Sequence, residues 1–203
     1  MGLLRSVCVY CGSGLGADPA YAEAAQILGR DLAEAEVRLV YGGGSVGLMG
    51  TVARAVLDGG GLVTGIIPRF LQNRERRMDD LTETILTDDM HERKKLMFDH
   101  ADAFVALPGG VGTLEELVEQ MTWAQLGRHE KPVLIANIGG FWNSLVALLD
   151  QMRAERFIRA EMDVSCLVAN QAEDIVPMLK RAAGKKPQKA LEQTAAVAPL
   201  SRM

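Results

Sequence analysis

Three features are scarce in this sequence, and each scarcity argues against a class of protein. Only three cysteines occur, Cys8, Cys11 and Cys166, so a framework of paired disulfides is excluded and a reducing compartment is favoured. No apolar run reaches the roughly 20 residues that a membrane-spanning helix needs. Residues 1–5 have neither the long apolar stretch nor the cleavage site of a signal peptide. We therefore expect a cytoplasmic protein with no membrane partner.

Excess positive charge is absent as well. The chain has 22 Lys and Arg against 26 Asp and Glu, a net charge of −4. Because general binding to nucleic acids depends on a basic surface that neutralises phosphates, we expect no nucleic-acid partner. With 48% apolar and 24% charged residues among 203, the composition is that of a globular protein, and the length fits one domain better than two.

Cys8 and Cys11 form a C-x-x-C pair, a spacing that redox and zinc sites also use. Cys8 lies inside the apolar run 6–10, which we expect to be a strand, and residues three apart in a strand face opposite sides. No second cysteine pair or nearby histidine completes a set of metal ligands. We therefore expect no metal site.

Short runs rich in β-branched residues alternate along the chain with longer helical patterns, which is typical of parallel strands joined by crossover helices. Several runs are apolar throughout, as in strands buried on both faces. The expected strands are residues 6–10, 37–41, 62–67, 84–87, 103–107, 132–137 and 164–168, and the expected helices are 19–35, 48–58, 89–101, 113–126, 142–154 and 172–182. We predict an α/β fold, a single doubly wound, Rossmann-like parallel sheet with helices on both faces, over residues 1–183.

The composition changes at the carboxyl end. Residues 184–203 hold three Lys and one Arg against one Glu, together with Ala, Pro and Gln. We predict a polar, basic and loosely structured C-terminal tail. The sequence leaves open whether this tail packs on its own domain or on a second subunit.

Ligands of doubly wound sheets bind at the carboxyl ends of the strands, where this sequence has glycine-rich turns. The first turn covers residues 11–16 and the second covers residues 41–50. Gly42, Gly44 and Gly47 of the second turn satisfy the dinucleotide pattern G-x-G-x-x-G.

The surroundings of that pattern argue against the cofactors it usually binds. The next expected strand leads into Pro68 and Arg69 and not into the acidic residue that holds the ribose of NAD. Leu48 stands where a Walker A loop requires Lys. Backbone N–H groups at a helix start are nevertheless sufficient to bind the phosphate of a mononucleotide, so phosphate binding stays open.

The third glycine turn, residues 108–116, follows the expected strand 103–107. Thr113 and Glu116 fit a capping box, S/T-x-x-E, which would account for both residues without any function. Three glycines before Thr113 are costly in chain entropy, and they favour a turn that another molecule approaches closely. The residues alone leave both interpretations open.

Together with Met90, Arg93 and Lys94 upstream, this turn resembles the Lonely Guy (LOG) family, the cytokinin-activating phosphoribohydrolases that are also labelled lysine decarboxylase-like. The family pattern P-G-G-x-G-T-x-x-E is complete at residues 108–116, and Arg93 precedes Glu116 by the family's spacing of 23 residues. The resemblance covers roughly residues 5–180.

The resemblance implies hydrolysis of the N-glycosidic bond of an N6-modified adenosine 5′-monophosphate, which releases the free base and ribose 5-phosphate without a cofactor or a metal. It implies Arg93 and Glu116 as catalytic residues. The residues that it places in contact with the substrate are Glu75, Lys94, Gly110, Val111, Gly112, Thr113, Leu114, Glu115 and Thr122. From the glycine turns and from the helical face shared by Met90 and Arg93, we add Ser13, Gly43, Gly44 and Met90.

The residue chemistry fits such a reaction. Crossover helices run antiparallel to the strands, so the helix starts before and after strand 103–107 lie at the same edge, and Arg93 and Glu116 should converge. Cleavage of a nucleoside C1′–N bond passes through an oxocarbenium-like state, which a carboxylate stabilises or supplies with an activated water. We expect Glu116 in that role and Arg93 as the cation near the departing base. Phosphate binding or orientation of Glu116 by Arg93 stays open.

Thr122 lies six residues beyond Glu116, roughly 120° away around a helix axis, so one helix does not easily aim both side chains at one ligand. Our hypothesis is that Thr122 serves the site of a second subunit, which fits the dimers of the family. We expect a homodimer or higher homo-oligomer with the site near the subunit interface.

Two other functions remain alternatives. A nucleotide-binding carrier or sensor of the same fold would hold a phosphorylated ligand on the glycine loops, and Glu116 would only cap its helix. A decarboxylase would need pyridoxal phosphate on a lysine, and no lysine here sits on a loop with an evident partner for the pyridinium nitrogen. The preferred base cannot be read from the sequence.

Overall fold

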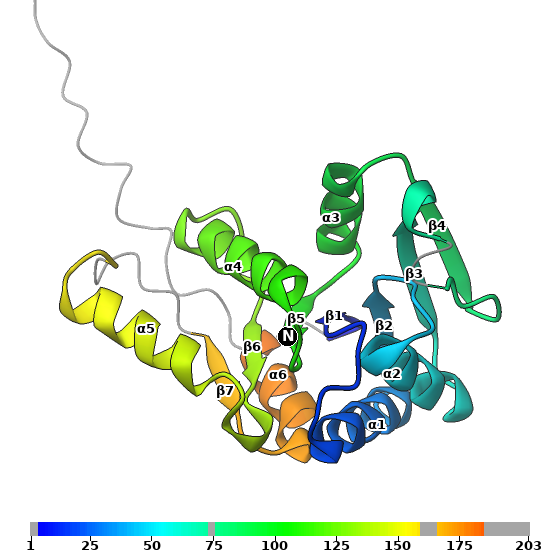
Figure 1. The fold of residues 1–203 in the computed structure, drawn as a ribbon, viewed down its shortest axis with the longest axis horizontal. Helices are drawn as coiled ribbons and strands as arrows, with labels where there is room; N and C mark the ends of the chain where they lie inside the picture. Colours follow the sequence, from blue (N-terminus) through cyan, green and yellow to red (C-terminus); the bar gives the residue numbers. More distant parts are fainter. Residues whose placement is uncertain (1–3, 73–75, 159–165, 185–203) are drawn as a thin grey trace, which may run out of the picture.

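A computed structural model describes residues 4–72, 76–158 and 166–184 of the chain (Figure 1). They form one sheet of seven parallel strands in the order β4-β3-β2-β1-β5-β6-β7. The strands are β1 (Ser6–Tyr10), β2 (Arg38–Tyr41), β3 (Val63–Pro68), β4 (Glu83–Thr87), β5 (Ala103–Ala106), β6 (Val133–Ala136) and β7 (Leu167–Ala169). The α-helices are α1 (Pro19–Glu34), α2 (Gly47–Asp58), α3 (Met90–Asp99), α4 (Val111–Gln125), α5 (Asn143–Ala154) and α6 (Ile175–Ala183). The predicted fold class is confirmed.

The order of the strands places a switch point in the middle of the sheet. From β1 the chain builds outward to β4, and it then returns through α3 to pair β5 with the other side of β1, with Val7 beside Ala103 and Tyr10 beside Ala106. The loops after β1 and β5 therefore diverge to opposite faces. Ligands of open α/β sheets bind in the crevice that such a divergence leaves.

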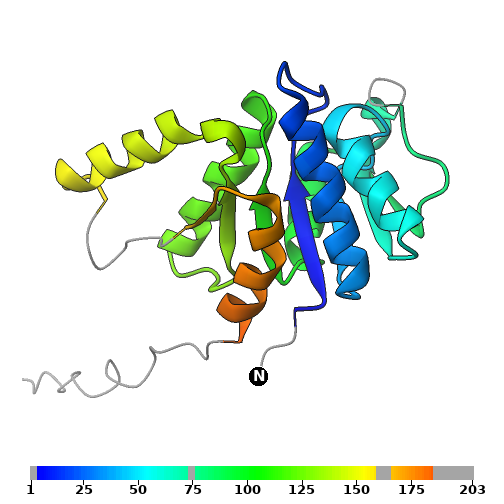
Figure 2. The same ribbon diagram turned by 90° about the horizontal axis from the view of Figure 1, so that it is seen from below.

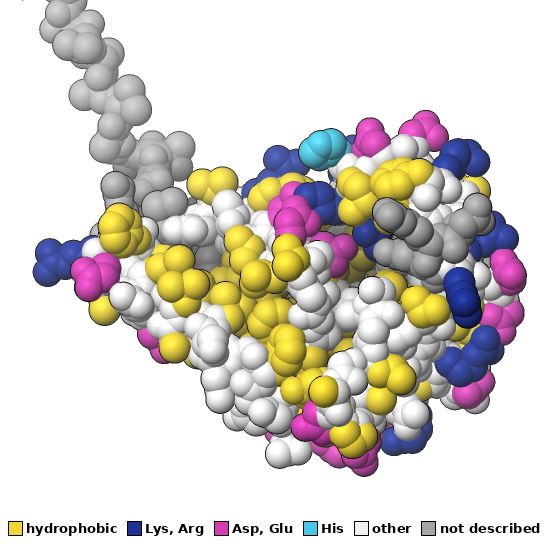
Figure 3. Space-filling view, viewed as in Figure 1, with side chains coloured by type: hydrophobic (Ala, Val, Ile, Leu, Met, Phe, Trp, Pro, Cys, Tyr) yellow, Lys and Arg dark blue, Asp and Glu magenta, His cyan; other side chains and the backbone are white. Residues whose placement is uncertain are grey.

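Helices cover both faces of the sheet. Helices α1, α2 and α6 lie on one face, and α3 and α4 lie on the other (Figures 1 and 2). Helix α5 extends away from the sheet at the β7 end (Figure 2), and Leu149 is its one buried residue. Apolar side chains gather on the surface over the half of the molecule that carries α4 and α5 (Figure 3).

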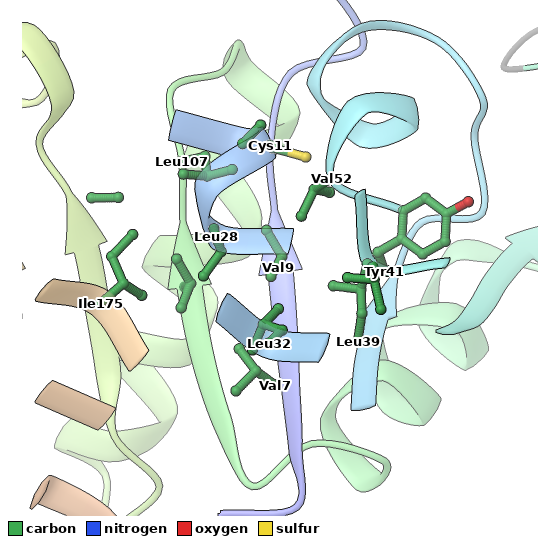
Figure 4. Close-up of a cluster of buried hydrophobic side chains, with 14 of the residues drawn as sticks. Val7, Val9, Cys11, Leu28, Leu32, Leu39, Tyr41, Val52, Leu107 and Ile175 are labelled. Atoms are coloured by element: carbon green, nitrogen blue, oxygen red, sulfur yellow. The ribbon is translucent and has the colours of Figure 1, made fainter. Parts of the chain in front are cut away.

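The core follows the alternation of side chains along the buried strands. Val7 and Val9 of β1 pack with α1 and α2 (Figure 4), whereas Cys8 and Tyr10 pack in a second cluster under α3 and α4. Cys11 belongs to the first cluster, so the C-x-x-C spacing leaves the two thiols in different clusters, as predicted. Burial also raises the pKa of the Cys8 thiol, which disfavours the reactive thiolate.

The predicted elements differ from the observed ones mainly at their ends. The strand expected at 164–168 is the three-residue β7, which begins at Leu167, and residues 164 and 165 lie outside the described residues. The helix expected at 172–182 starts as a 3₁₀ turn, Ala172–Asp174, before α6. The helix expected from 113 begins two residues earlier, at Val111.

The basic tail predicted at 184–203 lies outside the described residues beyond Gly184. Among the helices that the structure describes, none combines the length and the apolar character needed to cross a membrane.

Candidate active site

A cavity of about 360 Å³ opens at the carboxyl edge of the sheet, beside the switch point. It lies between the loop after β1, the start of α3 and the start of α4. The predicted site residues that line it are Ser13, Met90, Arg93, Gly110, Val111, Gly112, Thr113, Glu115 and Glu116. The first and third glycine turns and the start of α3, which are far apart in the sequence, thus contribute to one cavity.

Arg93 and Glu116 converge in this cavity, as the course of the crossover helices predicts. The Arg93 Nη1 atom lies 3.5 Å from Oε1 of Glu116, and the two side chains are only 7% and 12% exposed. Arg93 Nε also donates a hydrogen bond to the carbonyl oxygen of Ile66, at 3.1 Å. The site therefore holds a largely buried cation whose orientation is set by β3 on one side and by a carboxylate on the other.

Of the two interpretations that the sequence left open for Thr113 and Glu116, the capping box does not form. The N-cap of α4 is Gly110, which has no side chain to cap the helix, so both residues lie inside the helix. Thr113 is buried with its hydroxyl against Gly109, in the space that a Cβ at Gly109 would need. Because Glu116 lies in the second turn, it lines the cavity and does not reach back to the N-cap.

The helices that start around this edge use their first N–H groups differently. The side chains of Asp18 and Asp89 cap α1 and α3. At the start of α2, the N–H group of Leu48 donates to the carbonyl oxygens of Gly12 and Gly14. These three helix starts are therefore engaged by groups of the protein itself.

The N-cap of α4, like that of α2, provides no side-chain hydrogen bond, and among the described residues no carbonyl outside the helix takes the place that Gly12 and Gly14 take at α2. Its first residues, Val111 and Gly112, are exposed and line the cavity. The N-terminus of a 15-residue helix carries a partial positive charge and donors that favour an anion. The start of α4 therefore presents N–H groups to the cavity without a capping side chain.

Gly43 and Gly44 of the second glycine turn do not line this cavity. Gly43 and Gly44 are buried beneath the connection between β3 and β4. The Gly43 carbonyl accepts a hydrogen bond from the N–H group of Met78 at 3.1 Å, and Gly44 pairs with Arg77 in an isolated antiparallel bridge. The structure thus does not bring these two predicted contact residues to the cavity.

Lys94 lies beside the cavity in an ionic cluster. Its Nζ atom donates to Oε1 of Glu115 at 2.6 Å and to Oε1 of Glu119 at 2.9 Å. Burial alone would lower the pKa of the Lys94 ammonium, but the hydrogen bonds to Glu115 and Glu119 outweigh burial and raise it. Lys94 is therefore a fixed positive charge that ties α3 to α4.

Two other predicted contact residues, Leu114 and Thr122, do not line the cavity. Leu114 packs against the second core cluster. Thr122 is exposed, and its hydroxyl donates to the carbonyl oxygen of Val118 on its own helix at 2.7 Å. Glu75 lies outside the described residues.

Comparison with known proteins connects this site to a family. The family model described as "Possible lysine decarboxylase" matches residues 49–179. Cytokinin riboside 5′-monophosphate phosphoribohydrolase LOG3 of Arabidopsis thaliana is 48% identical over 176 residues, which cover 87% of this chain and 82% of that protein. The probable phosphoribohydrolase LOG4 of Oryza sativa subsp. japonica is 46% identical over 99% of this chain and 91% of its own length. The chain belongs to the LOG family.

Solved structures extend the likeness of this LOG-family chain at the level of the fold alone. The molybdenum cofactor binding protein of Rippkaea orientalis superimposes with a TM-score of 0.65 at 21% identity, over 89% of this chain and 98% of that one. The molybdenum cofactor carrier protein of Chlamydomonas reinhardtii gives a TM-score of 0.66 at 17% identity, over 90% and 100% of the two chains.

The LOG motifs do not include every residue that lines the cavity. Met49 and Leu71 contribute apolar side chains to its wall. Met49 lies within the second glycine turn, so the glycine pattern at the end of a strand marked the part of the chain that contains it. Leu71 belongs to a 3₁₀ turn after β3, Arg69–Leu71, and no pattern in the sequence marked it.

Proposed function

We propose that this chain hydrolyses the N-glycosidic bond of adenosine 5′-monophosphates of the cytokinin riboside type and releases the free base and ribose 5-phosphate. The observation that carries the proposal is the buried pair of Arg93 and Glu116, which faces the same cavity as the uncapped start of α4. The names of the similar plant proteins support the substrate class. Three cysteines, too few for a disulfide framework, support a cytoplasmic location.

The distance along α4 from its first N–H groups to Glu116 suits the distance from the phosphate to the sugar in a nucleoside monophosphate. The N–H groups of Val111, Gly112 and Thr113 would hold the 5′-phosphate. Glu116 lies three residues beyond Thr113, roughly 4.5 Å further along the helix axis. A phosphate at the helix start would therefore leave the sugar beside the Glu116 carboxylate.

In the proposed reaction, a water molecule attacks C1′ and Glu116 accepts a proton from that water. The C1′–N bond breaks, its electron pair leaves with the base, and the base takes up a proton from solvent. The Glu116 carboxylate also stabilises the positive charge that develops on the sugar. Arg93 keeps the carboxylate oriented and places positive charge near the departing base. Because a guanidinium stays charged, Arg93 does not itself donate the proton.

Glu116→Gln tests the proposal, since it keeps the size of the side chain and removes the base. We expect turnover of N6-isopentenyladenosine monophosphate to fall roughly 10²- to 10⁴-fold while nucleotide binding persists. Glu92→Gln is the matched control, because Glu92 is exposed and its carboxylate accepts a hydrogen bond from the backbone N–H of Asp88, just before α3. Release of free base and ribose 5-phosphate is measured for the monophosphate, for AMP and for their nucleosides.

The same assay separates the enzyme from a carrier of the same fold. A wild-type protein that binds the monophosphates but releases base from none of them would be a carrier or sensor. Unchanged turnover in Glu116→Gln would remove Glu116 from catalysis. The ratio of rates for the two monophosphates reports whether the N6 group matters.

Lys94 and Lys131 do not fit the decarboxylase reaction that the description of the family model suggests. A lysine that binds pyridoxal phosphate needs an amine that is readily neutral. Lys94 is held as an ammonium by two carboxylates, and Lys131 lies at the opposite edge of the sheet with its Nζ bonded to the Phe98 carbonyl. A purified protein with the yellow colour of bound pyridoxal phosphate would contradict this argument.

We also propose a homodimer with the site near the subunit interface. Val111, Val118 and Leu126 of α4 and the segment after it are 83%, 42% and 69% exposed, and Thr122 lies on the same stripe by its helical spacing. Leu148, Met152 and Phe157 add exposed apolar side chains on α5 and just beyond it. We call these seven residues the α4–α5 face. Val111 also lines the cavity, so a second copy on this face would reach the edge of the site.

A further inference from the structure

Gly42 occupies a special place beside the buried Arg93. It directly follows the last residue of β2 and is itself buried. A Cβ atom added to Gly42 would lie closer than 3.0 Å to Nη2 of Arg93, and 3.3 Å from Sδ of Met49. Both obstacles are the far ends of side chains, and neither is backbone. A side chain at position 42 would therefore compete directly with the Arg93 guanidinium for space.

The backbone does not require glycine at this position. Gly43 and Gly47 have φ values of 80° and 60°, in the left-handed region where other residues are strained. Gly42 is outside that region, so alanine could adopt its backbone conformation. What glycine provides at position 42 is room for another residue's side chain.

Three elements enclose the guanidinium that uses this room. Its Nε donates to the Ile66 carbonyl of β3, its Nη1 lies 3.5 Å from Glu116 of α4, and its Nη2 lies over Gly42 at the end of β2. A guanidinium is planar and rigid, so a displacement of Nη2 also moves Nη1. The contact at Gly42 therefore helps to set the distance between Arg93 and Glu116.

We propose that Gly42 is a positioning residue, whose missing side chain fixes the Arg93 guanidinium against Glu116. The inference rests on the proposed function, in which these two side chains act on the substrate. It gives the first glycine of the second turn a role in aligning the catalytic pair and not in contacting phosphate.

The test is a cycle of two substitutions, with kcat and KM measured on N6-isopentenyladenosine monophosphate. We expect Gly42→Ala to lower kcat roughly 10- to 100-fold, because displacements of about 1 Å in a catalytic group can have such effects. In an Arg93→Lys background, which has no Nη2, the same substitution should change kcat less than about twofold, because the two effects are coupled. Gly184→Ala is the matched control, since Gly184 is exposed at the end of α6, its φ of −79° is open to alanine, and its added Cβ comes no closer than 3.4 Å to another atom.

A second readout does not depend on activity. In a crystal structure of Gly42→Ala, we expect the guanidinium to be displaced and its separation from Glu116 to differ from 3.5 Å. A guanidinium that has not moved overturns the inference. An equal loss of kcat in the wild-type and Arg93→Lys backgrounds, or no loss in either background, also overturns it. So does a Gly42→Ala substitution that prevents folding in both backgrounds. If the wild-type protein releases no base, the proposed function fails, and the crystal structure alone decides the role of Gly42.

Discussion

Arg93 and Glu116 form a pair in which each partner offsets the burial of the other. Charges taken out of water lose hydration, and a buried partner that remains alone is strongly destabilising. Both side chains are almost fully buried, and Arg93 has a further acceptor in the Ile66 carbonyl. The pair is therefore important for stability as well as for the proposed chemistry.

This dependence leads to a prediction about stability. Arg93→Met should lower the free energy of unfolding by on the order of 3 kcal/mol, because the Glu116 carboxylate stays buried without its cation. The double variant Arg93→Met/Glu116→Gln should recover part of that loss, since no charge remains. Denaturant unfolding of the wild type, the two single variants Arg93→Met and Glu116→Gln, and the double variant measures these free energies of unfolding. A single variant as stable as the wild type would contradict the argument.

At the scale of elements, the start of α4 combines a weak cap with the position proposed for the phosphate. Gly110 has φ −88° and ψ −160°, a conformation open to any residue, and a Cβ there meets nothing within 4 Å. An aspartate at this N-cap position would be a better cap than glycine by a few tenths of a kcal/mol. The chain thus uses a residue that leaves the helix N–H groups available.

We therefore predict that Gly110→Asp raises thermal stability slightly and weakens binding of the nucleotide. Its carboxylate would accept from the first N–H groups of α4 and repel the phosphate, so KM for the monophosphate should rise about tenfold or more. Gly110→Asn is the control, because it caps the helix without a charge and should affect KM less. Equal KM values for Gly110→Asp and the wild type would show that the phosphate binds elsewhere.

The elements also show how far sequence reasoning reached. Apolar runs predicted the sheet, because strands buried on both faces leave a strong local pattern, as in Ser6–Tyr10. The start of α4 was misplaced because Thr113 and Glu116 imitate a capping box, while the true N-cap, Gly110, has no side chain to signal it. The burial of Gly43 and Gly44 depends on contacts with Met78 and Arg77, more than 30 residues away, which no local pattern contains.

At the scale of the whole molecule, helix α5 and the exposed stripe of α4 suggest that one chain is not the complete assembly. Helix α5 is 12 residues long, yet Leu149 is its one buried residue. An apolar surface of this kind is typical of an interface between subunits. Thr122 lies on a different side of α4 from Glu116, as their spacing of six residues predicts. In a dimer formed through the α4–α5 face, Thr122 would face the second copy.

Val118→Asp tests this arrangement, because in a two-fold symmetric interface each substitution introduces two unpaired charges. We expect the wild type to be dimeric and Val118→Asp to be monomeric by light scattering, with turnover reduced because Thr122 no longer reaches a neighbouring site. Leu62→Asp is the matched control. Leu62 is 47% exposed just before β3, in the half of the sheet away from β6 and β7, so this variant should stay dimeric. A Val118→Asp protein that remains dimeric would exclude the α4–α5 face as the interface. A monomer with full wild-type turnover would instead show that each chain carries a complete site.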